Sequence, residues 1–173
     1  MKRVPAVLSG VLLAGLLAAC GSASSLPDPA PCQSPSPLPT SAAAPRITEG
    51  RAYFTALQDQ LTQLEDLETT FKLTNPTNAF PSNSTFRPAV AKFIDDSTCV
   101  AQSLKSLEPP TAQSSTNKST LDDALDSYIA HLQAGRAAIL ARNVTDYRTF
   151  WNGLDAKFDA VRYAASMPAQ RGR

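Results

Sequence analysis

The chain has 173 residues, a mass of 18.4 kDa and a net charge of +1 from 16 basic and 15 acidic side chains. This near balance argues against nucleic acid or an anionic membrane surface as the main partner, because both favour strongly basic proteins. One histidine and three cysteines exclude every site that needs two histidines, and most metal sites. The 14 prolines are unevenly spread, so we expect part of the chain to lie outside a packed domain.

The segment 1–19 has the organisation of an export signal. Met1-Lys2-Arg3 is positively charged, and an uninterrupted run of apolar and small residues extends from Val7 to Ala19. That run is too short to cross about 30 Å of bilayer hydrocarbon as a mature helix. A charged start, a short apolar middle and small residues before a cleavage site are typical of a secretory signal.

Leu17-Ala18-Ala19-Cys20 resembles the lipobox of bacterial lipoproteins and is followed by the small residues Gly21 and Ser22. The resemblance extends no further than Ser22. It implies cleavage before Cys20, diacylglycerol (palmitate-type acyl chains) on its thiol and an extracytoplasmic protein on the cell membrane or outer membrane. Removing the segment 1–19 takes away Lys2 and Arg3 and leaves a slight acidic excess. Lipid rather than charge would therefore hold the protein to its membrane partner. The alternative is an ordinary secretory signal in which the Ala-Ala-Cys sequence is coincidental.

The segment 20–45 is predicted to form a lipidated cysteine followed by a disordered tether. Half of the 14 prolines lie between Gly21 and Pro45, and most of the other residues there are Ser, Ala or Thr. Such a composition buries too little apolar surface to offset the entropy of ordering. A spacer is the preferred interpretation, and a proline-motif docking site is the alternative.

From Arg46 the hydrophobic pattern acquires the period of helices. Residues at steps of three and four form four stripes, divided by prolines. The first two stripes are Phe54, Leu57, Leu61, Leu64, Glu68 and Phe71, then Phe86, Val90, Phe93, Ser97, Val100, Leu104 and Leu107. The last two are Leu121, Leu125, Tyr128, Leu132, Gly135 and Ile139, then Val144, Tyr147, Trp151, Leu154, Phe158, Val161 and Ala165. This pattern predicts an all-α fold, an antiparallel four-helix bundle over 46–168, with a disordered tail at 169–173.

Polar residues before three of the stripes are placed to begin helices. Thr85 is expected to cap the second helix, Ser119 or Thr120 the third, and Asn143 the fourth, after a turn centred near Arg142-Asn143.

Two cysteines remain once Cys20 is assigned to lipid. Cys99 falls at an outward position of the second stripe, and export would place it in an oxidising compartment. A Cys32–Cys99 disulfide is therefore our hypothesis. The rival interpretation is two unrelated free thiols.

Antiparallel pairing across the third turn puts Gly135 opposite Phe150 and Trp151. We expect small-against-large core packing there. The alternative is a ligand pocket formed by Tyr128, Gly135, Tyr147 and Trp151.

The remaining polar candidates do not assemble a recognisable catalytic site. His131 lies at the edge of the third stripe, where we expect a hydrogen-bonded boundary histidine. Acidic residues cluster at 65–68, 95–96 and 122–126 without the loop of a calcium hand, so we expect solvated helix faces and no metal site. The sequence predicts no catalytic residue, no enzyme activity and no cofactor.

The combined sequence features predict a tethered, non-catalytic binding or protein-interaction module of the cell envelope. Its predicted partners are the membrane, through the lipid, and an envelope protein, with no nucleic acid. The alternative is a small-ligand carrier or sensor with a pocket between helices. The whole also resembles, loosely, the short uncharacterised helical lipoproteins of bacteria, including the Leu-x-x-Leu-x-Pro-Pro pattern from Leu104 to Pro110.

Overall fold

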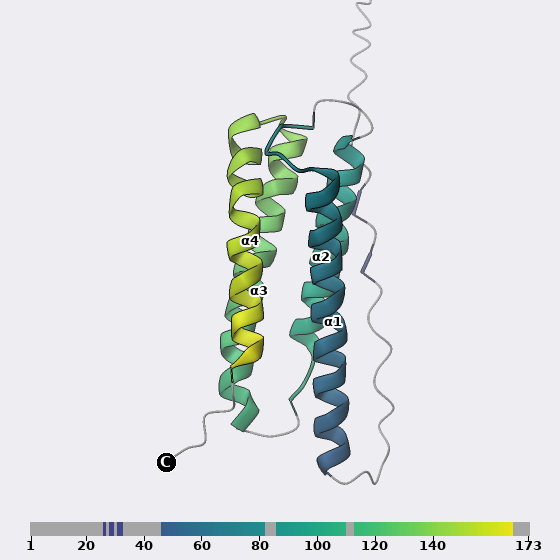
Figure 1. The fold of residues 1–173 in the computed structure, drawn as a ribbon, viewed down its shortest axis with the longest axis vertical. Coiled ribbons are helices and arrows are strands. Elements are labelled where there is room, and N and C mark those ends of the chain that lie inside the picture. Colours follow the sequence, from purple (N-terminus) through teal and green to yellow (C-terminus); the bar gives the residue numbers. More distant parts are fainter. Residues whose placement is uncertain are drawn as a thin grey trace, which may run out of the picture.

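A computed structural model describes residues 26, 28–29, 31–32, 46–81, 86–109 and 113–167. The helices are α1 (Arg46–Thr74), α2 (Phe86–Ser106), α3 (Gln113–Leu140) and α4 (Val144–Ser166), and Figure 1 shows them side by side along the long axis of the molecule. The predicted export signal, Cys20, most of the predicted tether at 20–45, the cap Thr85 and the tail at 169–173 lie outside the described residues.

Ion pairs between α1 and α4 establish that these helices are antiparallel. Lys72 Nζ lies 3.0 Å from Asp155 Oδ1. One heptad earlier on α1, Glu65 Oε1 lies 3.7 Å from Nη1 of Arg162, which is one heptad later on α4. Each helix also packs against the next along the chain, most extensively α3 against α4. The predicted all-α helical bundle is confirmed.

The core is made mainly of the predicted stripes, with differences at helix ends and at Phe150, which is buried where the fourth stripe was predicted to pass through Trp151. Phe54, predicted to lie in the core, is 60% exposed, and Tyr53 is buried in its place. The ion pair with Glu65 places Arg162 of α4 at the same height as Glu65 on α1, and α4 ends at Ser166, about one turn further on. Helix α4 therefore stops short of Phe54, and no other described helix covers Phe54 on the side that faces α4. Phe86 and Val144 are also exposed, since each is the first residue of its helix.

Helix α3 begins earlier than expected. Ser119 and Thr120, predicted as alternative caps, lie inside a helix that starts at Gln113. Serine and threonine cost only a few tenths of a kcal/mol in a helix interior, so they do not stop the helix from extending toward the preceding prolines.

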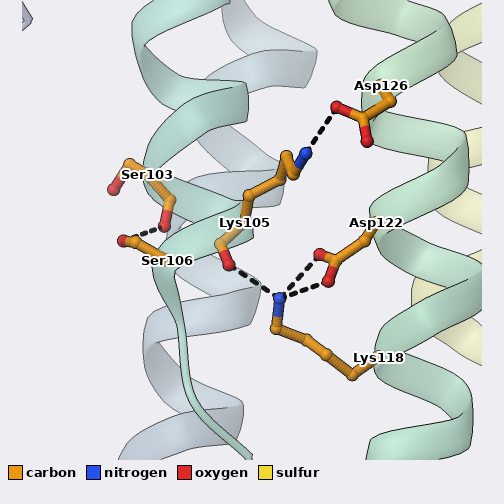
Figure 2. A network of polar contacts seen from close by, with 6 residues as sticks. All are labelled: Ser103, Lys105, Ser106, Lys118, Asp122 and Asp126. Atoms are coloured by element: carbon orange, nitrogen blue, oxygen red, sulfur yellow. Dashed lines mark hydrogen bonds and ion pairs between the residues drawn. The ribbon is translucent and has the colours of Figure 1, made fainter.

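The end of α2 is stabilised by a cation from α3 (Figure 2). Lys118 Nζ donates to the carbonyl oxygen of Lys105 at 2.7 Å and to both oxygens of Asp122 at 2.6 and 2.7 Å. Lys105 in turn pairs with Asp126 of α3. A positive group at a helix C-terminus satisfies a carbonyl left without an intrahelical partner and favours the helix dipole.

The turn between α3 and α4 is centred where the sequence predicts. Arg142 adopts a left-handed conformation with φ 53°. Asn143 then caps α4, its side-chain oxygen accepting from the backbone N–H groups of Thr145 at 3.1 Å and Asp146 at 3.2 Å. The predicted cap is confirmed.

Candidate functional site

A carboxyl group lies inside the bundle at Glu68. Its place in the apolar stripe of α1 brings it to the core, where it is only 6% exposed. Fully buried Ser97 of α2 and Tyr128 of α3 lie on the core side, and α4 contributes Asp155 and Asp159. Polar groups of α3 and α4 therefore lie near one buried acid of α1, and Ser97 of α2 adjoins Tyr128.

The surroundings of Glu68 favour its neutral form. Burial raises its pKa to about 8, and a hydrogen bond with Asp155, which only the protonated carboxyl can donate, acts in the same direction. The charges of Asp155 and Asp159 raise the pKa further, while Lys72 opposes them. At neutral pH Glu68 is therefore mainly a carboxylic acid.

The core side of this acid has unsatisfied polar atoms. Glu68 Oε2, Ser97 Oγ and the Tyr128 hydroxyl complete no hydrogen bond of normal geometry within the described part of the chain, although the two hydroxyls lie close together. Burial, with the negative charge of Glu68 nearby, raises the pKa of Tyr128, so its phenol stays protonated. Buried polar atoms without partners are costly and uncommon in native cores.

The outer side of Glu68 forms the floor of a surface groove of about 410 Å³, which we name the α1/α4 groove. Its walls are formed by side chains of the two helices, most of them charged. They are Glu65, Glu68, Thr69, Lys72 and Leu73 of α1, and Asp155, Phe158, Asp159 and Arg162 of α4. Four acids and two bases make the groove net negative whether or not Glu68 is ionised.

Lys72 closes one end of this groove and is held from three sides. Its ammonium nitrogen lies 3.0 Å from Asp155, donates to the Trp151 carbonyl oxygen at 3.2 Å, and lies 3.6 Å from the centre of the Trp151 ring. The indole N–H of Trp151 donates to the Asn75 carbonyl oxygen at 3.0 Å. Since the chain has a single tryptophan, its tryptophan fluorescence comes from Trp151, the residue that contacts Lys72.

The predicted disulfide is present. Cys32 and Cys99 are bonded, with Cα atoms 5.2 Å apart and a sequence separation of 67. Pro31 and Cys32 thereby lie beside a second groove, between α1 and α2, that includes Gln63 and Asp95.

The residues of the predicted interhelical pocket lie in packed surroundings. Tyr128 and Tyr147 are fully buried, and a Cβ atom built on Gly135 would lie 2.5 Å from Phe150 Cδ2. Trp151 is half-buried and is bound to Lys72 of α1 and to Asn75, the residue after α1. The α1/α4 groove is lined by other residues.

His131 is hydrogen-bonded, as expected for a boundary histidine. Its Nε2 lies 2.8 Å from the Phe150 carbonyl oxygen, so Nε2 carries the proton and donates it. Within the described residues, no three His, Cys, Asp or Glu side chains are placed to share a metal ion.

Sequence reasoning missed the importance of Glu68, although the signal was present. Glu68 belongs both to the apolar stripe and to the acidic cluster at 65–68, and only the first of these positions implies a buried charge. The neighbour that matters, Asp155, lies on the last helix, and its register against α1 cannot be obtained from either stripe alone.

Comparison of the chain with family models, curated proteins and solved structures finds no match. None of the described helices is long and apolar enough to cross a bilayer.

Proposed function

We propose that this protein is an exported bacterial lipoprotein whose helical bundle is a non-catalytic binding module, held by lipid on Cys20 and able to dock another envelope protein. The observation that carries the proposal is the bond between Cys32 and Cys99. Disulfides persist mainly in oxidising compartments outside the cytoplasm. The lipobox-like Leu17–Cys20 segment independently supports the same destination.

The disulfide also limits how far the bundle can lie from its proposed anchor. The chain from Cys20 to Cys32 (32 − 20 = 12 steps) spans at most about 43 Å at roughly 3.6 Å per residue. Without the bond, the chain from Cys20 to Arg46 (46 − 20 = 26 steps) would allow up to about 94 Å at the same rise. A bundle held this close to the bilayer is suited to partners in the same membrane.

A binding role is favoured over catalysis by the state of the candidate groups. His131 is bound to a backbone carbonyl oxygen of α4. Four described acids lie in ion pairs that join helices, among them Asp95 with Arg136 and Asp126 with Lys105. These arrangements serve packing rather than proton transfer to a substrate.

The proposal is tested by fractionating host cells that produce wild-type protein or a Cys20→Ala variant. A photo-crosslinker at the exposed position Tyr163 reports neighbouring proteins. We expect the wild type in the membrane with one reproducible cross-linked protein, and the variant released from the membrane without it. Equal membrane retention of the variant would contradict lipid anchoring, and identical cross-links in both would contradict a membrane-proximal partner.

The second candidate is a small-ligand carrier or sensor. The observation that favours it is the α1/α4 groove with its buried acid, rather than the region of Gly135 and Tyr147. A saturable change in Trp151 fluorescence on adding a ligand would support this function, because Lys72 joins the groove to the indole ring.

A further inference from the structure

We propose that one end of the bundle, which we name the basic end, rests on the surface of an anionic phospholipid bilayer. The basic end consists of residues 69–81, 86–94 and 127–154. They include the end of α1, the start of α2, the end of α3 and the start of α4, which lie together at the upper end of the bundle in Figure 1. This inference assigns the contact surface and orientation of the bundle, and it rests on the proposed function for the location beside a membrane.

The first argument is a separation of charge that the fold creates. The basic end has one acidic side chain, Asp146, and six basic ones, a net charge of +5 (6 − 1). The six are Lys72, Arg87, Lys92, Arg136, Arg142 and Arg148. The other described residues between Arg46 and Met167 have six basic and 13 acidic side chains, a net charge of −7 (6 − 13). The balanced charge of the whole chain therefore conceals a surface suited to an anionic membrane.

Three of the six cations are available to an anionic partner. The three that form ion pairs are Lys72, Lys92 and Arg136. Arg142 and Arg148 are exposed and Arg87 is partly exposed, and within the described part of the chain none of them forms an ion pair. The one acid, Asp146, accepts a hydrogen bond from Asn143 Nδ2 at 2.6 Å. Lipid phosphates are the anions that such unpaired arginines favour.

The second argument is the apolar surface at the same end. Six large hydrophobic side chains are exposed among the described residues, and four of them belong to the basic end. The four are Leu73, Phe86, Leu140 and Val144. Each lies within one turn of the end of its helix. A nucleic acid backbone would need only the cations, whereas a bilayer interface takes cationic and apolar side chains together.

The third argument is the depth at which the two kinds of side chain lie. Val144 is the first residue of α4, and Arg148 lies one turn behind it, a rise of about 6 Å along the axis. Apolar side chains of interfacial helices enter about 5–10 Å into the boundary between headgroups and acyl chains. With Val144 inserted to that depth, Arg148 lies at the level of the headgroups.

The segment that follows α1 is held against α4 and gives the basic end a defined shape. The indole N–H of Trp151 donates to the Asn75 carbonyl oxygen at 3.0 Å, and Asn78 Nδ2 donates to Asn152 Oδ1 at 3.2 Å. Residues 75–81 include no acidic side chain that would repel phosphate groups.

The proposed anchor can reach this end. Cys99, which is bonded to Cys32, lies 13 residues (99 − 86) after the start of α2 at Phe86, about 20 Å along the helix. The chain from Cys20 to Cys32 spans at most about 43 Å, so Cys20 can lie level with the basic end. Anionic headgroups would repel the acidic remainder of the bundle, and charge therefore selects the end that faces the membrane.

The test is the depth of a nitroxide label on full-length protein in vesicles of phosphatidylcholine, alone or mixed with phosphatidylglycerol. The label is placed by Leu140→Cys at the basic end or by Tyr163→Cys near the opposite end of the bundle. These positions make a matched pair, because Leu140 is 53% and Tyr163 67% exposed. Accessibility to oxygen, which concentrates in lipid, and to a nickel complex that stays in water gives the depth. The parent protein without an added cysteine is the labelling blank.

We expect the Leu140 label to enter lipid in the vesicles that contain phosphatidylglycerol and to stay in water on phosphatidylcholine alone. The Tyr163 label should stay in water on both.

Charge reversals in the protein labelled at position 140 test the arginines. Each arginine near an anionic surface strengthens binding about fivefold, so Arg142→Glu with Arg148→Glu should lower the ratio of docked to free bundle at least about 25-fold. Arg148→Glu alone should lower it at least about fivefold. Arg51→Glu is its matched control, because Arg51 is an exposed arginine of α1 outside the basic end, and it should leave the ratio nearly unchanged. Should the double variant not fold, the two single variants still decide.

The proposal is overturned by a Leu140 label as exposed to water as the Tyr163 label, by equal depth with and without phosphatidylglycerol, or by equal effects of Arg148→Glu and Arg51→Glu. A Leu140 label that stays in water on vesicles but becomes immobile in native host membranes would overturn it in favour of a protein partner.

The intact mass of the same sample reports separately whether Cys20 carries lipid. Lipid on Cys20 with the Leu140 label in water would refute this inference alone. An unlipidated protein whose Leu140 label enters anionic vesicles would refute only the anchoring.

Discussion

Replacing Glu68 by glutamine should remove most of the pH dependence of stability between pH 4.5 and 8. The folded-state pKa of Glu68 is about 8, against an ordinary value of 4.5, so the folded protein holds this proton more tightly than the unfolded chain. The resulting stabilisation is fully present below pH 4.5, declines as pH rises, and is lost above pH 8.

The size of the effect follows from the displacement of the pKa. A difference of about 3.5 units (8 − 4.5) corresponds to about 5 kcal/mol at 1.36 kcal/mol per unit, and we take this as an upper value. Glutamine has the shape of the protonated acid and cannot ionise. We therefore expect the variant to match the wild type near pH 5 and to exceed its free energy of unfolding by several kcal/mol at pH 8.5.

The assay is urea denaturation of the full-length protein at pH 5, 7 and 8.5, followed by circular dichroism and by Trp151 fluorescence. Burial also raises the pKa of Tyr53 and Tyr147, but these phenols titrate well above this window. Glu65→Gln is the control, because Glu65 is half-exposed and pairs with Arg162 at the groove edge. Parallel pH profiles for wild type and Glu68→Gln would refute the reasoning.

Three further changes test other parts of the structure by the same denaturation measurement. Cys99→Ser should lower the free energy of unfolding by about 4 kcal/mol, because a disulfide with a sequence separation of 67 restricts the unfolded chain. Reducing agent should lower the stability of the wild type by the same amount and leave the stability of the variant unchanged. Gly135→Ala should destabilise by about 1–3 kcal/mol despite its better helix propensity, because the new Cβ meets the Phe150 ring, and a gain in stability would contradict this packing. Asn143→Ala should cost about 1 kcal/mol by removing the α4 cap, whereas Asn143→Ser should cost less.

The fold could be predicted because each stripe faces a helix that covers it along most of its length. The third stripe, from Leu121 to Ile139, is buried as expected. The first stripe was wrong at Phe54. Whether Phe54 is buried depends on how far α4 extends, and the sequence around Phe54 does not determine that length. The Ser119 or Thr120 cap failed for a related reason, because a residue able to cap a helix is also tolerated inside one.

The candidate site was harder to predict from the sequence than the fold. The disulfide could be predicted because two cysteines remained and Cys99 faced outward. The groove could not, since it depends on the register of α1 against α4, which brings Asp155 beside Glu68. A glutamate within an apolar stripe is the one feature of the sequence that indicates this site.

Export and lipid anchoring are the central proposals for this protein, and one measurement tests both. It is the intact mass, before and after reduction, of full-length protein extracted from the membranes of its own host. We predict the mass of the chain from Cys20 to Arg173 plus that of the lipid on Cys20. Before reduction this mass should be lower by two hydrogens, because Cys32 and Cys99 are bonded, and reduction should restore them. A chain that retains the segment 1–19 with an unmodified Cys20, or has free thiols at Cys32 and Cys99, would contradict the account.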